Sequence, residues 1–577
     1  MLTNQPRSNI GNRETSALDG LLERLLTAPN WLLLMASGVI LGLAYPPNPI
    51  GWLFAGIGFV PLFIVVERSK RWKTDLWQSY LAFLVFSGFS TWWVGSWQAN
   101  TDPWLIVSSL LLVVVHPLFF SVPVILYGII RRRTSLGIAL LFFVLLFCGG
   151  EYLHALGEVS YPWLTLGNTT TYNLYFMQIA EITGVWGLSL LLLAQNGAIG
   201  WWLIGRKGRT SDQRRTSVRK TLVILGATTV PVYLVGFFLL GQAVDISAEN
   251  ESVNILIVQP NQNPWDKWRK DDPVDHIVDN GTMTIEGIKQ VGPVDAVLWA
   301  ENAIPYPLTN PRYADRKRTM ASVMVQIGVP VITGFPDYHE YLSAEKAKPS
   351  SKQLKENGRT IYYDHFNSIG VFNPDGSIGD VYHKSQLVPF GERVPYIDAA
   401  PFLAELLSWD VGISTWGVGG GPHAIDLPLG GRTVRFAGMV CFESVYPNMV
   451  RVFVDDGAEF LTIVTNDGWY LGTPGPLQHE RFAMLRAIET RRGIARAANT
   501  GISCTIWPDG RIINETAEGE RRVLRGSIPL NDAKTLYVQF GDWLPLGALL
   551  GAIGLLVFTL IRREDEMPDR DPPTSRS

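Results

Sequence analysis

The feature that most constrains the fold is a series of apolar segments, each close to the ~20 residues that a helix needs to cross a bilayer. Seven precede residue 245 and an eighth lies near the C-terminus: 31–48, 51–67, 77–97, 104–130, 135–153, 176–204, 220–241 and 543–561. Between the last two, residues 250–530 have the mixed composition of an α/β domain. We therefore predict an eight-helix membrane bundle, built from residues 30–245 and 540–562, with one domain outside the membrane.

The distribution of lysine and arginine among the loops predicts which side of the membrane each loop faces. These residues gather in the N-terminal tail (1–29), in every second loop and after residue 562, whereas loops 45–50, 98–103 and 154–175 contain none. Because basic loops stay cytoplasmic, we predict cytoplasmic tails at 1–29 and 563–577, the second disordered. Residues 250–530 then lie on the outer, periplasmic face of a bacterial inner membrane, with the first segment an uncleaved anchor. The net charge of −3 does not indicate nucleic acid as a partner.

The outer domain alternates strand and helix patterns. Short apolar runs predict strands at 253–258, 296–299, 329–332, 434–440 and 460–464, and amphipathic patterns predict helices at 273–290, 312–327, 445–456 and 478–497. Such alternation favours sheets layered with helices, in which active residues collect at strand ends.

Three predicted strand ends carry reactive groups. Glu301 follows 296–299, Lys384 follows a strand at 381–383, and Cys441 follows 434–440. Together they supply a general base, a cation for an oxyanion and a nucleophile, and the N-terminus of helix 445–456 would favour the thiolate. Singly, Glu301 and Lys384 also fit solvated rim charges, and Cys441 also fits a small buried apolar residue.

The residues around these three groups carry a resemblance. Trp299-Ala-Glu-Asn-Ala-Ile-Pro305, His383-Lys-Ser-Gln-Leu-Val-Pro-Phe-Gly-Glu-Arg-Val-Pro395, Cys441-Phe-Glu-Ser-Val-Tyr-Pro447 and Thr465-Asn-Asp-Gly-Trp469 resemble the apolipoprotein N-acyltransferases. These enzymes are the membrane-bound branch of the carbon–nitrogen hydrolase (nitrilase) superfamily, and the resemblance covers nearly the whole chain. It implies eight membrane helices and a nitrilase-like αββα sandwich at 250–530.

The resemblance also implies the reaction. A phospholipid acylates Cys441, and the acyl group then passes to the α-amino group of an S-diacylglyceryl cysteine at the start of an apolipoprotein. Glu301 would be the base and Lys384 the oxyanion stabiliser, with Glu392, Phe442, Glu443, Trp268 and Trp469 in support. This chain departs from the family at Ala300, often Pro, and at Phe442, often Tyr. No cofactor or metal is expected, and we expect a monomer.

Several alternatives remain open at this level. Water as the acceptor would make the protein a membrane-anchored amidase, and a transporter or an inactive lipoprotein-binding scaffold is a third class. The apolar stretch 390–421, with a helix at 400–409, fits either a lid at the membrane surface or a helix packed on the domain. Cys504 is interpreted as a buried structural thiol and His479 as a core or capping residue, and a disulfide between Cys441 and Cys504 is undecided.

Overall fold

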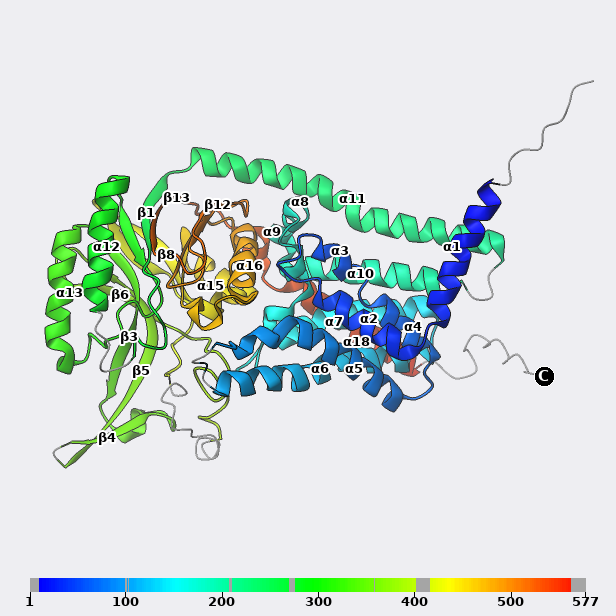
Figure 1. Ribbon diagram of the computed structural model, residues 1–577, viewed down its shortest axis with the longest axis horizontal. Helices are drawn as coiled ribbons and strands as arrows, with labels where there is room; N and C mark the ends of the chain where they lie inside the picture. The colour runs from blue at the N-terminus through cyan, green and yellow to red at the C-terminus, as the bar shows by residue number, and fades with distance from the viewer. Residues whose placement is uncertain are drawn as a thin grey trace, which may run out of the picture.

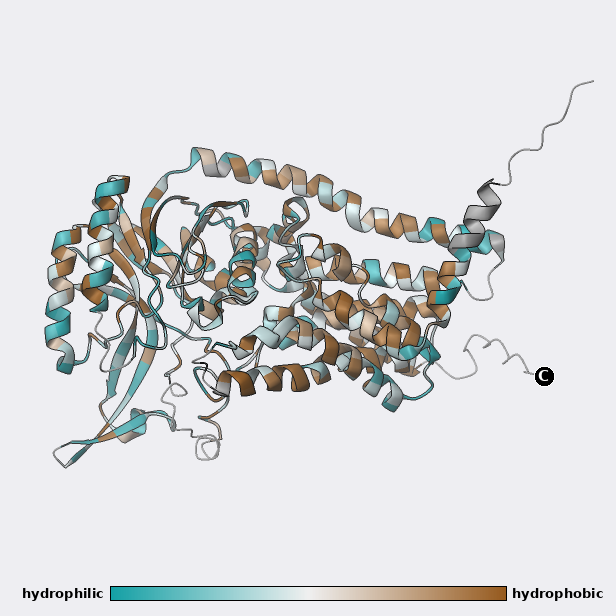
Figure 2. Cartoon of the chain, in the orientation of Figure 1, coloured by the Kyte–Doolittle hydropathy of each residue, from teal (hydrophilic) through white to brown (hydrophobic). Residues whose placement is uncertain are grey.

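The computed structural model describes residues 10–98, 101, 103–206, 210–268, 275–356, 358–400 and 416–561. Figure 1 shows two parts arranged end to end: a bundle of long helices, and an α/β domain at the end of the bundle opposite helix α1 (Ile10–Thr27). In Figure 2 hydrophobic residues dominate the middle of the bundle, and hydrophilic residues gather on the domain and at the far end of the bundle.

The bundle is made of long helices, together with the short helices α3 (Gly51–Ala55) and α4 (Val60–Arg68). The long helices are α2 (Asn30–Gly42), α5 (Trp72–Thr91), α6 (Pro103–Arg131), α7 (Leu136–His154), α10 (Val185–Ile204), α11 (Ser211–Glu249) and α18 (Trp543–Ile561). Between α7 and α10 lie the short elements η2 (Pro162–Leu164), η3 (Leu166–Thr170), α8 (Leu174–Met177) and α9 (Ala180–Thr183).

The prediction of eight spans is confirmed only in part. Among the described residues, six helical segments are long and apolar enough to cross a membrane: 51–68, 105–131, 136–154, 185–204, 212–245 and 543–561. A seventh is counted only if 19–27 and 30–42, bent by 102° from one another, form one span. The predicted segment 77–97 is a helix at Trp72–Thr91 followed by the 3-10 turn η1 (Trp92–Gly95), and its polar first turns keep it outside this group. The predicted segment 176–204 is long helix only from Val185.

The α/β domain contains two mixed sheets. The first has the order β13 (Arg522–Pro529), β1 (Ser252–Gln259), β2 (Ala296–Trp299), β3 (Val331–Tyr341), β5 (Arg359–Phe372) and β4 (Lys352–Glu356), with β6 (Ile378–His383) also paired to β5. The second has the order β12 (Ile512–Glu515), β11 (Cys504–Ile506), β10 (Ile494–Ala498), β9 (Phe460–Thr465), β8 (Arg432–Val440) and β7 (Ile425–Leu429). β1, β2 and β3 run parallel, as do β8, β9 and β10.

Alternate residues of each strand point to opposite faces of its sheet. One face of the first sheet therefore packs on the second sheet, and the other face packs on helices. On β1, Val253, Ile255 and Ile257 belong to the core shared with the second sheet. Leu256 and Val258 instead pack with α12 (His276–Val291) and α13 (Ala314–Ile327). Helices α15 (Pro447–Asp455) and α16 (Gly475–Thr490) contribute to the core of the second sheet. The layers are therefore helices, sheet, sheet and helices.

The predicted helix 478–497 was wrong at its C-terminal end. α16 ends at Thr490, and Arg491 takes a left-handed conformation with φ of 50°. The next residues, Ile494–Ala498, form the central strand β10, which is buried along its whole length. A buried strand has no polar face, so its alanines and isoleucine looked like a continuation of the helix.

The bundle and the domain share one hydrophobic core. At their junction the Gln478 side-chain amide, on α16, donates to the Pro46 carbonyl at 2.8 Å, and the Val185 amide donates to Glu489 at 2.8 Å. The Trp186 indole donates to Asp542, just before α18, at 2.7 Å. The loop between α7 and α10 is the part of the bundle that meets the domain closest to Cys441, as described below.

Candidate functional site

The topology brings the three predicted residues to one edge of the sandwich. Glu301 follows β2, and Lys384 follows β6. Because β5 is antiparallel to both β3 and β6, β6 runs in the same direction as β2 and ends at the same edge. Cys441 follows β8 in the facing sheet.

A chain of hydrogen bonds joins Glu301 to Lys384. The Asn367 amide nitrogen, on β5, donates to Glu301 at 2.7 Å and to Glu392 at 3.1 Å. The Lys384 ammonium donates to Glu392 at 2.9 Å. The Lys384 backbone amide also donates to the Asn367 carbonyl at 2.8 Å, so Asn367 positions both the base and the cation.

Burial and charge set the protonation of this group. Burial raises the pKa of Glu301, opposed by the positive charge of Lys384 and reinforced by the negative charge of Glu392. Burial alone would lower the pKa of Lys384, but Glu392 and Glu301 outweigh it and the pKa is raised. Lys384 is therefore a fixed ammonium, 1% exposed, and Glu301 is more basic than an ordinary carboxylate.

Cys441 lies in a strained turn rather than at a helix start. It has φ of 52°, in the left-handed region, and begins the 3-10 turn η6 (Cys441–Val445), whereas α15 begins only at Pro447. Burial raises the pKa of its thiol, as does the negative charge of Glu301, against the effect of Lys384. The expectation that a helix 445–456 would favour the thiolate is corrected: the thiol holds its proton until a base removes it.

Glu443 joins the cysteine turn to the lysine loop. One of its oxygens accepts from the Tyr382 hydroxyl at 2.7 Å and from the amides of Ser385 and Gln386 at 2.8 and 3.2 Å. The other accepts from the Val440 amide at 2.9 Å. Burial raises the pKa of Glu443 to about 7, against the effect of Lys384. Its four donors fix Cys441 relative to Lys384.

Aromatic residues connect the cysteine turn to the bundle. Phe442 stacks on Tyr161 and Trp163, with ring centroids 6.0 and 6.4 Å apart, and meets the edge of Tyr446 at 5.2 Å. The Trp163 indole donates to Gln478 on α16 at 2.7 Å. The loop after α7, rich in aromatic and polar residues, therefore packs against the cysteine turn from the side of the bundle.

The two predicted supporting tryptophans differ in position. Trp469 lies in the turn η7 (Asp467–Tyr470), and its carbonyl accepts from the Ser96 hydroxyl at 2.5 Å. Its ring meets the edge of Trp265 at 4.6 Å. Trp268 is 45% exposed. Trp265 was not predicted from the sequence.

Asn367 is the main residue that the sequence analysis missed. The sequence also did not indicate that His479 contacts the cysteine turn. His479 hydrogen-bonds the Cys441 carbonyl at 3.1 Å and Asp467 at 3.0 Å. Arg496 donates to Asp467 at 2.7 Å. His479 was interpreted as a core or capping residue, and its 3% exposure and these contacts agree with that interpretation.

Cys441, Asp467 and His479 offer three possible ligand atoms within 4.8 Å of one another. The guanidinium of Arg496 contacts both Asp467 and His479, so a cation there would meet a fixed positive charge. The arrangement fits a hydrogen-bonded support better than a metal centre.

Two other predicted features have different outcomes. All three cysteines are free thiols, with Cys148 and Cys504 buried, so Cys441 and Cys504 form no disulfide. All but the first residue of the helix predicted at 400–409 lie outside the described residues, as do residues 401–415 of the stretch 390–421.

Known proteins resemble both parts of the chain. Residues 37–198 match the family described as "Apolipoprotein N-acyltransferase N-terminal domain", and residues 255–537 match "Carbon-nitrogen hydrolase". The apolipoprotein N-acyltransferase of Chlorobaculum tepidum is 31% identical over 95% of this chain and 99% of its own length. That of Geobacter metallireducens is 28% identical over 91% of this chain and 94% of its own.

Among solved structures, Saccharomyces cerevisiae Nit3 of the nitrilase superfamily covers 48% of this chain and 90% of its own, at 16% identity and a TM-score of 0.34. The two family matches cover the first part of the bundle and the α/β domain. The Chlorobaculum tepidum relative aligns with nearly the whole of both chains at 31% identity. This chain belongs to the apolipoprotein N-acyltransferase family.

Proposed function

We propose that this protein transfers an acyl group from a membrane phospholipid, through a thioester on Cys441, to the α-amino group of the S-diacylglyceryl cysteine of an apolipoprotein. The observation that carries the proposal is the buried chain Glu301–Asn367–Glu392–Lys384 beside Cys441, at the junction with the bundle. Membership of the family supports the choice of acceptor.

In the first half-reaction Glu301 takes the proton of the Cys441 thiol, and the sulfur attacks the carbonyl carbon of a phospholipid ester. The oxyanion that forms is stabilised by the Lys384 ammonium, which Glu392 holds in place. When the carbon–oxygen bond breaks, the lysophospholipid oxygen takes the proton back from Glu301. The raised pKa of Glu301 suits both steps, because a more basic carboxylate takes the thiol proton more readily and can still return it to the leaving group.

In the second half-reaction the neutral α-amine of the apolipoprotein attacks the thioester carbonyl. Glu301 accepts the proton that the nitrogen loses, Lys384 again stabilises the oxyanion, and the carbon–sulfur bond breaks to give the amide. The departing sulfur recovers its proton from Glu301. An amidase reaction would use the same groups with water as the acceptor. The aromatic wall of Tyr161, Trp163 and Phe442 favours a lipid-bearing acceptor over water, because it places apolar surface beside the nucleophile.

The proposed roles of the supporting residues follow from their contacts. Glu392 fixes Lys384, Glu443 fixes the cysteine turn, and Phe442 and Trp469 join that turn and its neighbour η7 to the bundle. We assign Trp268, half-exposed at the domain surface, to contact with lipid.

The membrane arrangement belongs to the same proposal. α5 has 20 residues, or about 30 Å of helix, and it runs between α2 and α6, so we count it as a span despite its polar first turns. With α2 and the six apolar segments this gives eight spans. The basic loops and both tails then lie in the cytoplasm, and the α/β domain, with both lipid substrates, lies at the outer leaflet.

The proposal is tested by intact-mass measurement of the purified protein after incubation with phospholipid. We expect one acyl mass on the wild type, removable by hydroxylamine as for a thioester, and none on Cys441→Ala. Cys504→Ala is the matched control, because it removes the other thiol of the domain, and it should still be acylated. An adduct on Cys441→Ala, or none on the folded wild type, would contradict the proposal.

A further inference from the structure

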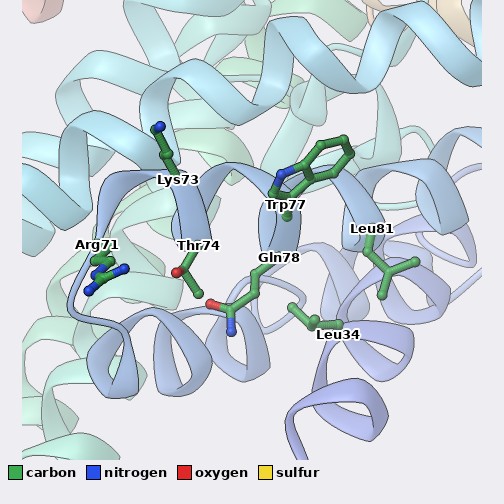
Figure 3. Close-up of a pocket in the computed structure, with 7 residues that line it drawn as sticks. All are labelled: Leu34, Arg71, Lys73, Thr74, Trp77, Gln78 and Leu81. Atoms are coloured by element: carbon green, nitrogen blue, oxygen red, sulfur yellow. The ribbon is translucent and has the colours of Figure 1, made fainter.

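A groove lies between α2 and α5, in the bundle. It is lined by Leu34, Arg71, Lys73, Thr74, Trp77, Gln78 and Leu81. Figure 3 shows the basic residues at one end of this row and Leu34 and Leu81 at the other. From Lys73 to Leu81 the helix rises about 12 Å, so the groove changes from charged to apolar over the depth of a head group and the first part of an acyl chain.

This α2–α5 groove is far from the catalytic site. The C-terminal end of α5 leads into η1, where Trp93 meets the edge of Tyr470 with ring centroids 5.2 Å apart. The N-terminal end, which carries Arg71 and Lys73, is about 30 Å away along a 20-residue helix. A lipid in the groove therefore cannot reach Cys441, and the groove is not the binding site of the acyl donor.

The basic end of the groove carries uncompensated charge. The neighbouring carboxylates are engaged elsewhere: Glu67 pairs with Arg131 at 2.5 Å, and Asp75 pairs with Arg132 at 2.8 Å. Arg71 and Lys73 are exposed, and within the described part of the chain neither forms an ion pair with a carboxylate. The Lys73 ammonium lies 5.8 Å from the centre of the Trp72 ring. The ring has no net charge, so this contact does not neutralise Lys73.

The surface around the groove is suited to the head-group region of a membrane. Trp77 is 69% exposed and Trp31, on α2, is 63% exposed. Exposed tryptophans beside basic residues are typical of the head-group region of a bilayer. Between the two ends, the Gln78 side-chain oxygen is buried and has no hydrogen-bond partner. It is an acceptor placed for a donor such as a hydroxyl group.

We propose that the α2–α5 groove binds an anionic glycerophospholipid whose head group carries hydroxyls, of the phosphatidylglycerol class. Its phosphate contacts Arg71 and Lys73, a head-group hydroxyl donates to Gln78, and the first part of an acyl chain lies against Leu34, Trp77 and Leu81. A zwitterionic lipid is disfavoured because its ammonium would lie beside two cations. A free phosphate would leave the apolar half of the groove empty.

The test is native mass spectrometry of the full-length, detergent-purified protein titrated with phosphatidylglycerol or phosphatidylcholine. All samples carry Cys441→Ala so that no acyl adduct forms. We expect tighter binding of phosphatidylglycerol, and about thirtyfold weaker binding to Arg71→Gln/Lys73→Gln, at roughly fivefold for each basic residue at a membrane surface. Phosphatidylcholine binding should change little.

The matched control is Lys70→Gln/Arg133→Gln, which removes the same charge from exposed positions of the same basic loops that do not line the groove. It should lower the affinity less than threefold. Equal losses for both double variants would mean diffuse attraction to a basic surface, and equal affinities for both lipids would exclude an anion site. Either result would overturn the proposal.

A second variant tests the role of Gln78. Gln78→Leu keeps the approximate shape of the side chain and removes the acceptor. It should weaken phosphatidylglycerol binding several-fold but leave phosphatidylmethanol, an anionic lipid without head-group hydroxyls, unchanged. A parallel loss for both lipids would contradict the assigned hydroxyl contact.

Discussion

At the scale of single residues, Asn367 determines how the base and the cation are held. One side-chain nitrogen serves Glu301 and Glu392 together, and the carbonyl of the same residue holds the Lys384 amide. One buried carboxylate, one half-buried carboxylate and one buried ammonium therefore share a single neutral bridge. Without it, Glu301 would lose its hydrogen-bond donor inside the domain.

Asn367→Leu should lower kcat/KM for acyl transfer by about 10- to 100-fold, since a hydrogen bond to a charged group contributes about 1.5–3 kcal/mol. The measurement is the rate of acyl transfer to a diacylglyceryl-cysteine peptide. Asn373→Leu, six residues along at a surface turn, is the control and should retain activity. An Asn367→Leu enzyme as active as the control would exclude this bridging role.

Glu392 gives a prediction about pH. In the proposed mechanism acylation requires ionised Glu301, so the rate should rise as the pH passes upward through the pKa of Glu301. Burial raises that pKa, Lys384 lowers it and Glu392 raises it. In Glu392→Gln the pKa falls, so the rising limb of kcat/KM should move to lower pH, while the maximal rate drops because Lys384 loses its partner.

The control for this measurement is Glu340→Gln, an exposed carboxylate on β3. Its pH profile should match the wild type. A rising limb that stays in place in Glu392→Gln, or moves to higher pH, would show that Glu301 is not the group being titrated.

The sequence identified Glu301, Lys384 and Cys441 because each directly follows a short apolar run, where the functional groups of layered sheets collect. Asn367 has no such signal. It lies inside β5, a 14-residue strand whose first half is exposed and whose second half is buried. Only the pairing of β5 with β3 and β6 places it between Glu301 and Lys384, and pairing is not visible in local periodicity.

At the scale of elements, the site depends on how the turn η6 is joined to the loop after β6. These two segments come from different sheets, and Glu443 connects them through one hydroxyl and three backbone amides. All four partners are donors, so the side chain must offer two acceptor oxygens. An amide at this position would turn an N–H group toward other donors.

Glu443→Gln should therefore cost about 1–3 kcal/mol of unfolding free energy and a larger share of the activity, because Cys441 loses its position relative to Lys384. Thermal unfolding and kcat/KM measure the two effects. Glu459→Gln is the matched control: it accepts from Arg435 at the other end of β8 and lies far from Cys441. If Glu443→Gln changed stability and activity no more than this control does, Glu443 would not be what connects η6 to the loop after β6.

Elements with strong local patterns were predicted well. β2 matches its predicted range of 296–299, and β8 and β9 differ from theirs by at most two residues at an end. β4, β5, β7, β12 and β13 were not predicted, because short or partly exposed strands take their stability from partners distant in the sequence. β10 was mistaken for helix because it is buried on both faces and so lacks the alternation of apolar and polar residues that marks a half-buried strand.

At the scale of the whole molecule, the domain and the bundle are one unit. The cysteine turn packs on the loop after α7, and the turn η7 bonds to Ser96 and Gln98 beyond α5. Cys441 is thus held at the face of the domain that meets the bundle. In the proposed function, this arrangement brings the reaction to lipids in the bilayer.

The proposed orientation can be measured by cysteine labelling with a membrane-impermeant maleimide on right-side-out spheroplasts. In a Cys441→Ala background the two remaining native thiols are buried. Ser343→Cys, exposed in the α/β domain, should react in intact spheroplasts, and Lys70→Cys should react only after permeabilisation. Labelling in the opposite pattern would reverse the orientation, and labelling of both sites in sealed spheroplasts would exclude the eight-span arrangement.

The most direct test of acyl transfer is a chase of the isolated acyl-enzyme. The acylated protein is freed of phospholipid and mixed with a diacylglyceryl-cysteine peptide, with the same peptide N-acetylated, or with buffer alone, and protein and peptide masses are followed over time. We expect one acyl mass to move from the protein to the free peptide, while the acetylated peptide and buffer leave the adduct in place. Release of free fatty acid at one rate in all three samples would show that water is the acceptor and that the protein is a hydrolase.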